Sequence, residues 1–348
     1  MLNRVCTLLE KGKLEIQTQM LEGPDDSSVV VEMKRGGICG TDLHYYQDGG
    51  IGTIRVSEPI ILGHEISGVV RELGSSVTSL SVGDKVAINP SLPCNNCAYC
   101  REDLHQHCTD LKFTGSAKTK PHIDGGFRNF MVAKASQCHR VEDHVTFAEA
   151  ACAEPLAVCL HAAAQVEDLK GKSVLVTGSG PIGALCVAVA ATQGAKHIVV
   201  TDLSDFTLAV AKQMGSTFEV NVAKSSALLS AFVEREGQFD VAFECSAAKA
   251  AIATAIDHVK PRGTIVLVGS AGETAFPLNV IVGKELNFKG TFRFHHEFAQ
   301  AVKYLNDKAL NVAPLITQTF PLEDAEKAMH AAADRGSAMK VQLMLDQD

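Results

Sequence analysis

The sequence predicts a two-domain α/β protein, in which a small β-rich domain is joined to a doubly wound parallel sheet. Its 348 residues suit about two domains. Short apolar stretches punctuated by glycine fill the first part, and strands alternate with helices from about residue 146, which is typical of a parallel sheet. We expect the β-rich domain to span 1–152 and to be completed by 293–348, with the parallel sheet in 153–292.

Three strands are expected in the β-rich domain, and turn residues bound each of them. A strand over 29–35 follows a polar turn. Two further strands are expected over 66–73 and 82–88, with Gly74 and Gly83 at turns. Short strands separated by glycine turns favour a compact β domain over a helical one.

A helix start marks the change of character near residue 146. Thr146 can cap a helix, with Glu149 three residues later as its capping-box partner. An alanine-rich helical stretch follows, and then the alternating units begin. Strands are expected over 173–177, 197–201, 241–244 and 264–268, helices over 182–193 and 206–214, and a last strand over 340–345 that pairs back with the first domain.

The composition excludes several classes of protein. A net charge of −8 argues against nucleic acid as a main partner. The first residues lack the apolar core of a signal peptide, and apolar runs such as 185–191 are too short to span a bilayer. Eleven cysteines without an export signal are expected to be metal ligands and buried thiols rather than disulfides. We therefore expect a cytoplasmic protein with neither a membrane nor a nucleic-acid partner.

Four cysteines lie in one short window of the β-rich domain. They are Cys94, Cys97, Cys100 and Cys108. Two C-x-x-C steps and one more thiol let four thiolates converge on a single tetrahedral ion. The spacing therefore predicts a closed structural zinc site.

A glycine-rich turn follows the strand expected over 173–177. It reads G-S-G-P-I-G and includes Gly178, Gly180, Pro181, Ile182 and Gly183. Such a turn between a strand and a helix lets the backbone approach a pyrophosphate, whose charge the helix N-terminus stabilises. In this context it predicts a Rossmann dinucleotide-binding domain, and the alternative is a glycine turn without a ligand.

Asp202 lies nineteen residues after Gly183, at the end of the next expected strand. A carboxylate there would accept hydrogen bonds from the adenosine ribose hydroxyls and would repel a 2′-phosphate. Residues 203–207 supply no arginine to bind such a phosphate. NAD is therefore favoured as the cofactor, with NADP as the alternative.

A second set of metal-ligating residues lies upstream of the four cysteines. Taken singly, Cys39 could be a buried thiol and His64 a core histidine. However, His64 and Glu65 belong to the pattern G-H-E-x-x-G-x-x-x-x-x-G-x-x-V, which resembles the zinc motif of the medium-chain alcohol dehydrogenases. The resemblance covers the whole chain, in the order Cys39, His64 with Glu65, the four cysteines, Glu154 and the glycine turn. It implies a GroES-like catalytic domain followed by a Rossmann domain.

The resemblance also implies a ligand set for a catalytic zinc, and so two zinc ions per chain. Cys39 and His64 match zinc ligands of the family. Glu154, followed by proline and leucine, matches the sorbitol dehydrogenase branch and would bind zinc directly or through its water. Glu65 would either be a ligand or support one.

Several loops are similar to the L-idonate 5-dehydrogenases of that branch, which act on a sugar acid. These loops are 35–47, 88–91, 113–117, 121–127 and 291–294. Arg293 matches a substrate-pocket arginine, with Tyr45 and Phe113 beside it. The alternative is a surface arginine on a strand.

The function implied by the resemblance is a zinc-dependent transfer of hydride from the C5 hydroxyl of L-idonate to NAD(P), which gives 5-keto-D-gluconate. Thr41 and His44 match a relay that carries the released proton to water, and a zinc-bound water beside Glu154 is the alternative carrier. The second hypothesis is a polyol dehydrogenase of the sorbitol or xylitol type. A non-catalytic NAD-binding structural or regulatory protein is the third. The resemblance also leads us to expect a homotetramer.

Overall fold

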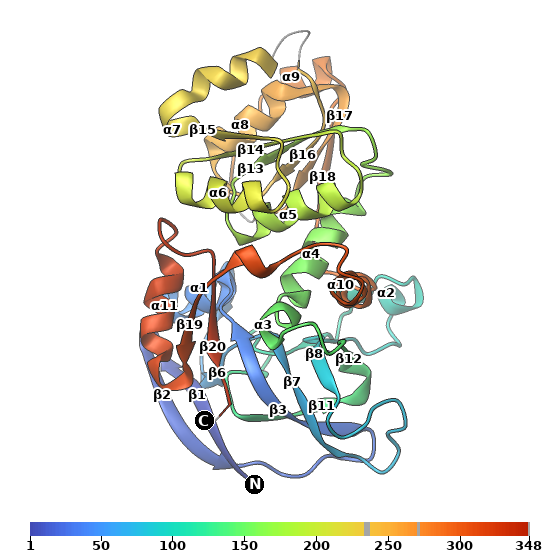
Figure 1. Ribbon diagram of the computed structural model, residues 1–348, viewed down its shortest axis with the longest axis vertical. Coiled ribbons are helices and arrows are strands. Elements are labelled where there is room, and N and C mark those ends of the chain that lie inside the picture. Colours follow the sequence, from blue (N-terminus) through green and yellow to red (C-terminus); the bar gives the residue numbers. More distant parts are fainter. Residues whose placement is uncertain (233–236, 270–271, 347–348) are drawn as a thin grey trace.

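The computed structural model describes residues 1–232, 237–269 and 272–346, which form two bodies stacked along the long axis of the molecule (Figure 1). The lower body contains the first strands together with the last strand, β20. The upper body contains β13 to β18, and α4 (Ala153–Ala163) lies where the two bodies meet. The boundaries expected at 152/153 and 292/293 stay predictions.

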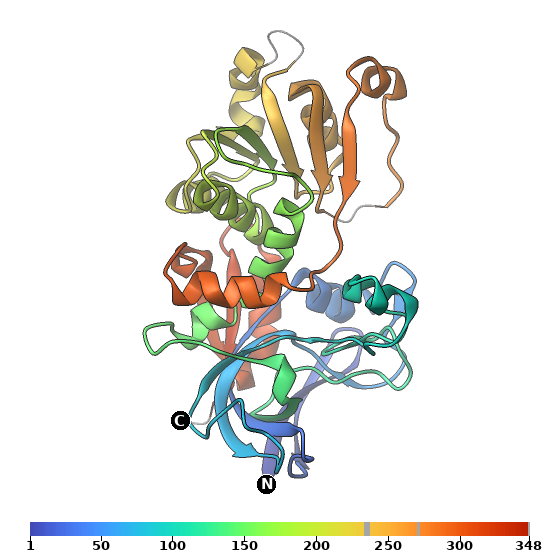
Figure 2. The ribbon, with the colours of Figure 1, turned by 90° about the vertical axis from the view of Figure 1, so that its right-hand side faces the viewer.

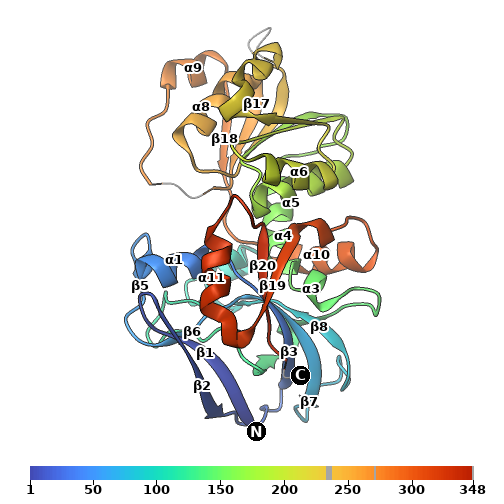
Figure 3. The same cartoon turned by 60° about the vertical axis from the view of Figure 1, so that its left-hand side comes forward.

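The lower body is built on a mixed sheet whose strand order is β12-β8-β7-β3-β20-β19, with β11 also paired to β3. The strands are β3 (Ser28–Gly37), β7 (Glu65–Leu73), β8 (Lys85–Ile88), β11 (Phe130–Lys134), β12 (Cys138–Arg140), β19 (Ile316–Pro321) and β20 (Lys340–Met344). β20 pairs with β3 as predicted, and Figure 3 shows β19, β20 and α11 (Ala325–Ala333) packed beside it. The last described strand therefore lies next to residues from the first fifty.

Shorter elements complete the lower body around this sheet. They are β1 (Leu2–Glu10), β2 (Lys13–Met20), β4 (Gly50–Ile51), β5 (Ile54–Arg55), β6 (Ile60–Ile61), β9 (Ser91–Leu92), β10 (Lys112–Phe113), α1 (Gly40–Asp48), α2 (Ala98–Arg101) and α3 (Phe147–Ala150). Thr146 caps α3 and forms the predicted capping box with Glu149. No helix in the described ranges has the length and apolar character needed to cross a membrane.

One strand boundary in the lower body differs from the sequence prediction. The strand expected over 82–88 begins only at Lys85, because Val82 and Gly83 form a turn. Gly83 has a φ of +95°, which breaks the extended backbone, and Val82 is exposed to solvent. The prediction included Val82 in the strand because its side chain is apolar, whereas Val82 belongs to the preceding turn.

The upper body is a parallel sheet with the order β15-β14-β13-β16-β17-β18. Its strands are β13 (Ser173–Thr177), β14 (His197–Asp202), β15 (Phe218–Asn221), β16 (Phe239–Glu244), β17 (Val259–Leu267) and β18 (Asn287–Gly290). Its helices, with the α10 that follows the sheet, are α5 (Pro181–Thr192), α6 (Asp205–Gln213), α7 (Val222–Ser225), α8 (Lys249–His258), α9 (Leu278–Gly283) and α10 (Glu297–Asn306). The strand order reverses between β13 and β16, and ligands of such sheets bind at that point, beyond the carboxyl ends of the strands.

Both faces of the sheet are buried at its central strand β13, which explains the apolar run from Val174 to Val176. Val174 and Val176 of β13 pack with α4 and α5 in one core cluster. Leu175, between them, packs on the other face against Ile252 and Ile256 of α8. Alternate residues of one strand therefore serve two cores, as is usual for a parallel sheet covered by helices.

Candidate active site

Three predicted metal ligands meet where β3 ends and β7 begins. Cys39 follows β3 and caps α1, while His64 and Glu65 lie at the start of β7, which pairs with β3. One ligand atom from each of the three lies within 4.8 Å of the others. A thiolate, an imidazole and a carboxylate at this spacing form a donor set that suits zinc. We call these residues the mixed-ligand cluster.

Asp42 orients two of these ligands, a role that the sequence prediction missed. Its buried carboxylate accepts hydrogen bonds from the N–H groups of Cys39 (2.9 Å) and Gly63 (3.2 Å) and lies 3.7 Å from Nδ1 of His64. Burial lowers the pKa of His64, but Asp42 and Cys39 outweigh it and hold that pKa well above its usual value. Because the carboxylate faces Nδ1, Nε2 is left for a metal. The available signal was the capping-box position three residues after Cys39.

A buried lysine from β20 neutralises Glu65, and this residue was also missed. Nζ of Lys340 donates to Oε1 of Glu65 at 2.6 Å and to the carbonyl of Ile38 at 3.2 Å. Gly37 permits this packing, since a Cβ there would lie 2.1 Å from Oε2 of Glu65. Oε2 is buried without a hydrogen-bond partner among the described residues, so it is the oxygen available to a metal. The available signal was a lysine at the start of a strand whose other residues are apolar except Gln342.

Glu154 reaches the same region from the first turn of α4. Its side chain is buried, and this burial raises the pKa of its carboxyl to about 7, with Glu65 adding to the effect and His64 opposing it. Glu154 lies outside the group of three whose ligand atoms are within 4.8 Å. Whether it would act directly or through water stays a prediction.

Phe113 connects the mixed-ligand cluster to Arg293. Its ring centroid lies 5.7 Å from that of His64, and the guanidinium carbon of Arg293 lies 3.9 Å from the Phe113 centroid on the ring face. Arg293 lies in a bend after β18 and not on a strand, with a left-handed φ of +54°. A non-glycine residue adopts that conformation at a cost of roughly 1–2 kcal/mol. Arg293 is thus separated from the predicted metal ligands by one aromatic ring, and its contact with a substrate stays a prediction.

The structure does not join the proposed relay residues into one hydrogen-bonded chain. Both lie on α1, where Thr41 is half-buried and His44 is exposed. Nδ1 of His44 lies 2.9 Å from a carboxylate oxygen of Asp48, and no described hydrogen bond links it to Thr41. Tyr45 is buried between them and the core, and its hydroxyl accepts a hydrogen bond from the N–H of Ala117. The relay stays a prediction.

The four cysteines of the lower body converge as predicted. One Sγ from each lies within 4.8 Å of the others, with 3.6 Å between Cys97 and Cys100 and 4.0 Å between Cys94 and Cys100. Zn–S bonds of about 2.3 Å place the sulfurs of a tetrahedron about 3.8 Å apart. The N–H groups of Thr109 and Cys100 lower the pKa of Cys97 to about 5, which favours the thiolate. We call residues 94–108 the four-cysteine lobe.

The glycine turn lies at the carboxyl end of β13, beside the reversal of strand order. A Cβ on Gly183 would lie 1.8 Å from the carbonyl of Gly178, so this glycine is needed for packing. A Cβ on Gly180 would meet nothing within 4 Å, which leaves the space in front of the turn free for a pyrophosphate. Pro181 and Ile182 begin α5 directly behind it.

Asp202 ends β14 next to this turn, as predicted. Its Oδ2 accepts a hydrogen bond from the N–H of Ser179 at 2.6 Å, and its Oδ1 accepts from Leu203 and Ser204. Asp202 therefore also fixes the shape of the glycine turn. A direct contact with the ribose hydroxyls stays a prediction.

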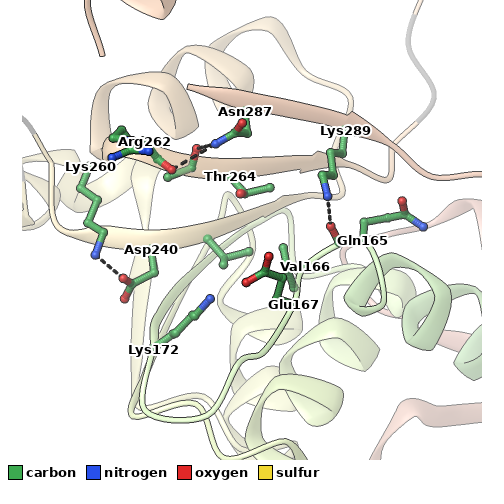
Figure 4. Close-up of a pocket in the computed structure, with 12 residues that line it drawn as sticks. Gln165, Val166, Glu167, Lys172, Asp240, Lys260, Arg262, Thr264, Asn287 and Lys289 are labelled. Carbon is green, nitrogen blue, oxygen red and sulfur yellow. Dashed lines mark hydrogen bonds and ion pairs between the residues drawn. The ribbon is translucent and has the colours of Figure 1, made fainter. Parts of the chain in front are cut away.

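A cavity of about 540 Å³ lies at the opposite end of the same sheet (Figure 4). Lys260 and Arg262 of β17 line it with Lys172 and Lys289, close to the amino ends of the strands. Lys260 pairs with Asp240, and Lys289 donates to a backbone carbonyl, as the dashed lines of Figure 4 show. Because dinucleotides bind beyond the carboxyl ends, this cavity is not part of the predicted cofactor site.

The fold and the two cysteine-containing clusters define a zinc-binding dehydrogenase with a GroES-like domain and a Rossmann domain. Residues 25–143 match the family described as "Alcohol dehydrogenase GroES-like domain", and residues 181–307 match "Zinc-binding dehydrogenase". The chain belongs to the zinc-dependent alcohol and polyol dehydrogenase family. The predicted fold class, enzyme class and family resemblance are thereby confirmed.

Among its relatives, the chain is similar to both a sugar-acid and a polyol dehydrogenase. It is 39% identical over 340 residues to L-idonate 5-dehydrogenase (NAD(P)(+)) of Escherichia coli (strain K12), covering 97% of this chain and 98% of the relative. It is 37% identical over 340 residues to sorbitol dehydrogenase of Homo sapiens, covering 96% and 94%. The crystal structure of L-idonate 5-dehydrogenase from Escherichia coli K-12 matches it with a TM-score of 0.95 at 38% identity, covering 99% of this chain and 98% of that one. The chain is thus a zinc-dependent dehydrogenase of polyols or sugar acids.

Proposed function

We propose that this dehydrogenase oxidises the C5 hydroxyl of L-idonate with NAD and releases 5-keto-D-gluconate. The observation that carries the proposal is the position of Arg293, whose guanidinium stacks on Phe113 beside the mixed-ligand cluster. A planar, permanently charged fork suits a substrate carboxylate better than it suits a neutral polyol. The similarity to the Escherichia coli L-idonate enzyme supports the same substrate class.

In this mechanism, Cys39 and His64 would hold the metal, and Glu65 or Glu154 would complete the set. Zinc bound there would act as a Lewis acid on the substrate hydroxyl, and NAD would accept the hydride. Asp42 keeps the His64 ring in its orientation, and Lys340 balances the charge of Glu65. Arg293 would hold the carboxylate, so that the C5 hydroxyl, at a fixed distance along the chain, is directed to the metal.

The proton of the hydroxyl must leave a buried site. Where Glu65 completes the metal set, Glu154 would accept this proton, directly or through a zinc-bound water. Burial raises the pKa of Glu154 to about 7, so that the carboxyl can exchange a proton near neutral pH. The alternative route through Thr41 and His44 would require a substrate hydroxyl or a water to bridge them. His44 is exposed and would pass the proton on to solvent.

The cofactor and metal assignments form part of the same proposal. Two zinc ions per chain are proposed, one in the mixed-ligand cluster and one in the four-cysteine lobe. NAD is proposed over NADP because Asp202 would repel a 2′-phosphate. Assembly as a homotetramer and a cytoplasmic location stay predictions.

A steady-state comparison of L-idonate with sorbitol and xylitol tests the substrate. A charge-assisted arginine–carboxylate contact contributes roughly 1.5–3 kcal/mol, so L-idonate should exceed sorbitol in kcat/KM by about ten- to a hundredfold. Arg293→Ala should remove most of that difference by slowing the sugar acid, and Arg293→Lys should restore only part of it. Arg262→Ala is the matched control. The backbone of Arg262 also has a left-handed φ, but its side chain lines the cavity at the amino ends of the upper sheet.

Equal efficiency on sorbitol and L-idonate would overturn the sugar-acid assignment and leave a polyol dehydrogenase of the sorbitol or xylitol type. The 37% identity to human sorbitol dehydrogenase is the observation that favours this second candidate. The alternative of a non-catalytic NAD-binding protein does not fit a member of this enzyme family whose predicted metal ligands are all present.

A further inference from the structure

A third group of metal-ligating side chains lies where the four-cysteine lobe meets the segment between β18 and α10. Asp103 and His105 belong to the lobe, whereas His295 lies two residues after Arg293. One ligand atom from each lies within 4.8 Å of the others. Figure 2 shows the segment descending from the edge strand β18 of the upper body to α10, past the lobe. The group therefore connects residues nearly two hundred positions apart in the sequence.

Two of the ligand-to-ligand distances in this group match those of a tetrahedral zinc site. Oδ1 of Asp103 lies 3.4 Å from Nδ1 of His105 and 3.4 Å from Nε2 of His295. Metal–ligand bonds of about 2.0–2.1 Å place neighbouring ligands of a tetrahedron about 3.3–3.4 Å apart. The other carboxylate oxygen, Oδ2, is held by Nε2 of His296 at 2.7 Å, which leaves Oδ1 directed at the two imidazoles. Such a supporting contact is typical of metal-binding carboxylates.

One nitrogen of this group lacks a partner. Nδ1 of His105 is buried and makes no hydrogen bond within the described part of the chain, even though a carboxylate oxygen lies 3.4 Å away. Buried polar atoms normally find a partner, so an unpartnered one facing a carboxylate and a second imidazole points to a missing ligand. Asp103 lies within ion-pair distance of all three histidines, but of these only His296 forms a hydrogen bond with it.

The two imidazole rings are stacked, with centroids 3.8 Å apart and planes 24° from parallel. Their in-plane lone pairs therefore do not yet meet at one point. The side chain of His295 is 25% exposed and that of His105 is 16% exposed, so the His295 ring has more freedom to turn. Binding of a common ion would therefore require the His295 ring to turn out of the stack.

We propose that Asp103, His105 and His295 form a third metal site, which takes a divalent ion of the zinc class. Two imidazoles and one carboxylate leave a fourth position for water, and they suit Zn²⁺, Co²⁺ or Ni²⁺ better than Ca²⁺ or Mg²⁺. The ion would link the lobe to the segment that carries Arg293, and so restrain that segment against Phe113. The inference does not depend on which substrate the enzyme oxidises.

The test is a titration of the full-length protein with Co²⁺ alone, after its thiolate sites have been saturated with zinc. We expect one further equivalent to bind, with visible d–d bands but no thiolate-to-cobalt charge transfer, because the site contains no sulfur. His105→Ala and His295→Ala should each weaken this binding at least about tenfold, and His296→Ala should weaken it by about ten- to a hundredfold. His107→Ala is the matched control and should bind as wild type, since His107 is an exposed histidine of the same lobe outside the group.

A second readout separates metal binding from a folding defect. Zn²⁺ added beyond the thiolate sites should raise the thermal midpoint of the wild type and of His107→Ala, but not that of the ligand variants. If His105→Ala does not fold, Asp103→Asn and His295→Gln provide the same comparison with smaller changes. The proposal is overturned if the wild type takes up no further equivalent, or if the double variant His105→Ala with His295→Ala retains it.

Discussion

The mixed-ligand cluster and the four-cysteine lobe are both predicted metal sites, but they are built in opposite ways. The lobe draws all its ligands from residues 94–108, and its core contains little beyond Cys100, Cys108 and Leu111. The mixed-ligand cluster combines residues from the end of β3 and the start of β7 with Lys340 of β20. It is surrounded by the main core of the lower body.

This difference indicates what shapes each site. The lobe has only the four-residue α2 and a three-residue turn of 3-10 helix, so we expect its shape to depend on a bound metal. In the mixed-ligand cluster, Asp42 and Lys340 already hold the ligands by hydrogen bonds and charge. We therefore expect the first site to be stabilised by a metal once one binds, and the second to be largely formed before a metal binds.

Cys39→Ser is the most direct test of this difference between the two sites. Loss of this ligand should lower kcat/KM by roughly a thousandfold or more, since the Lewis acid contributes several kcal/mol to the transition state. Because the surrounding protein holds the site, the variant should keep its circular dichroism spectrum and its affinity for NADH. Metal analysis should show one zinc fewer per chain. A variant that unfolds or loses the metal of the lobe would contradict the separation of the two sites.

Lys340→Met tests whether the mixed-ligand cluster is prepared by charge balance. Removing one partner of a buried ion pair costs about 3–5 kcal/mol, because the other charge is left buried and unpaired. We expect that loss in the free energy of unfolding of the metal-free protein, measured with urea. The double variant Glu65→Gln with Lys340→Met should recover part of it. Equal stabilities of Lys340→Met and wild type would show that the pair does not organise the site.

Cys97→Ser should show the opposite pattern to Cys39→Ser. The lobe would lose its metal, and the midpoint of thermal unfolding should fall by roughly 4–8 °C, which corresponds to about 2 kcal/mol. Turnover per folded molecule should change less than about tenfold. Cys138→Ser, which removes a buried thiol outside both clusters, serves as the control. Wild-type stability together with an unchanged zinc content would exclude a structural metal in the lobe.

Asp202→Ser tests a site outside both clusters, so it should change cofactor binding and leave the metal content unchanged. Its carboxylate accepts a hydrogen bond from the glycine turn, so its removal should weaken the binding of NAD by about tenfold. It should also relieve the repulsion of the 2′-phosphate of NADP. Asp205→Ser is the control, since Asp205 lies three residues further on and pairs with Lys224. Kinetics with both cofactors measure the effect. A wild type that already prefers NADP would show that Asp202 does not select the cofactor.

The sequence predicted best those features whose residues lie close together along the chain. The four cysteines, the glycine turn and the pair of His64 and Glu65 each lie within a short stretch, and the structure places each group as expected. In the upper body, the strands β13, β14 and β16 and the helices α5 and α6 were predicted to within two residues, whereas β17 begins at Val259, five residues before its predicted start, and β15, β18 and α7 to α9 were not predicted. Val82 was misassigned because an apolar residue in a turn carries no periodicity.

What the sequence could not predict depends on contacts between distant segments. Lys340 meets Glu65 across 275 positions, and Arg293 meets Phe113 through the bend after β18. Asp103 faces His295 in the same way, although each is unremarkable in its own segment. Only the pairing of β20 with β3 and the path from β18 to α10 bring these side chains together.

The contact between Lys340 and Glu65 has a consequence for the order in which the two metals are acquired during synthesis. The lobe has all its thiols once Cys108 has emerged, whereas the mixed-ligand cluster waits for Lys340, 232 residues later. At about 5–20 residues per second, translation of that interval takes roughly 12–46 s. The nascent chain would therefore bind zinc first in the lobe. The mixed-ligand cluster would bind its proposed zinc only after nearly the whole polypeptide has been made.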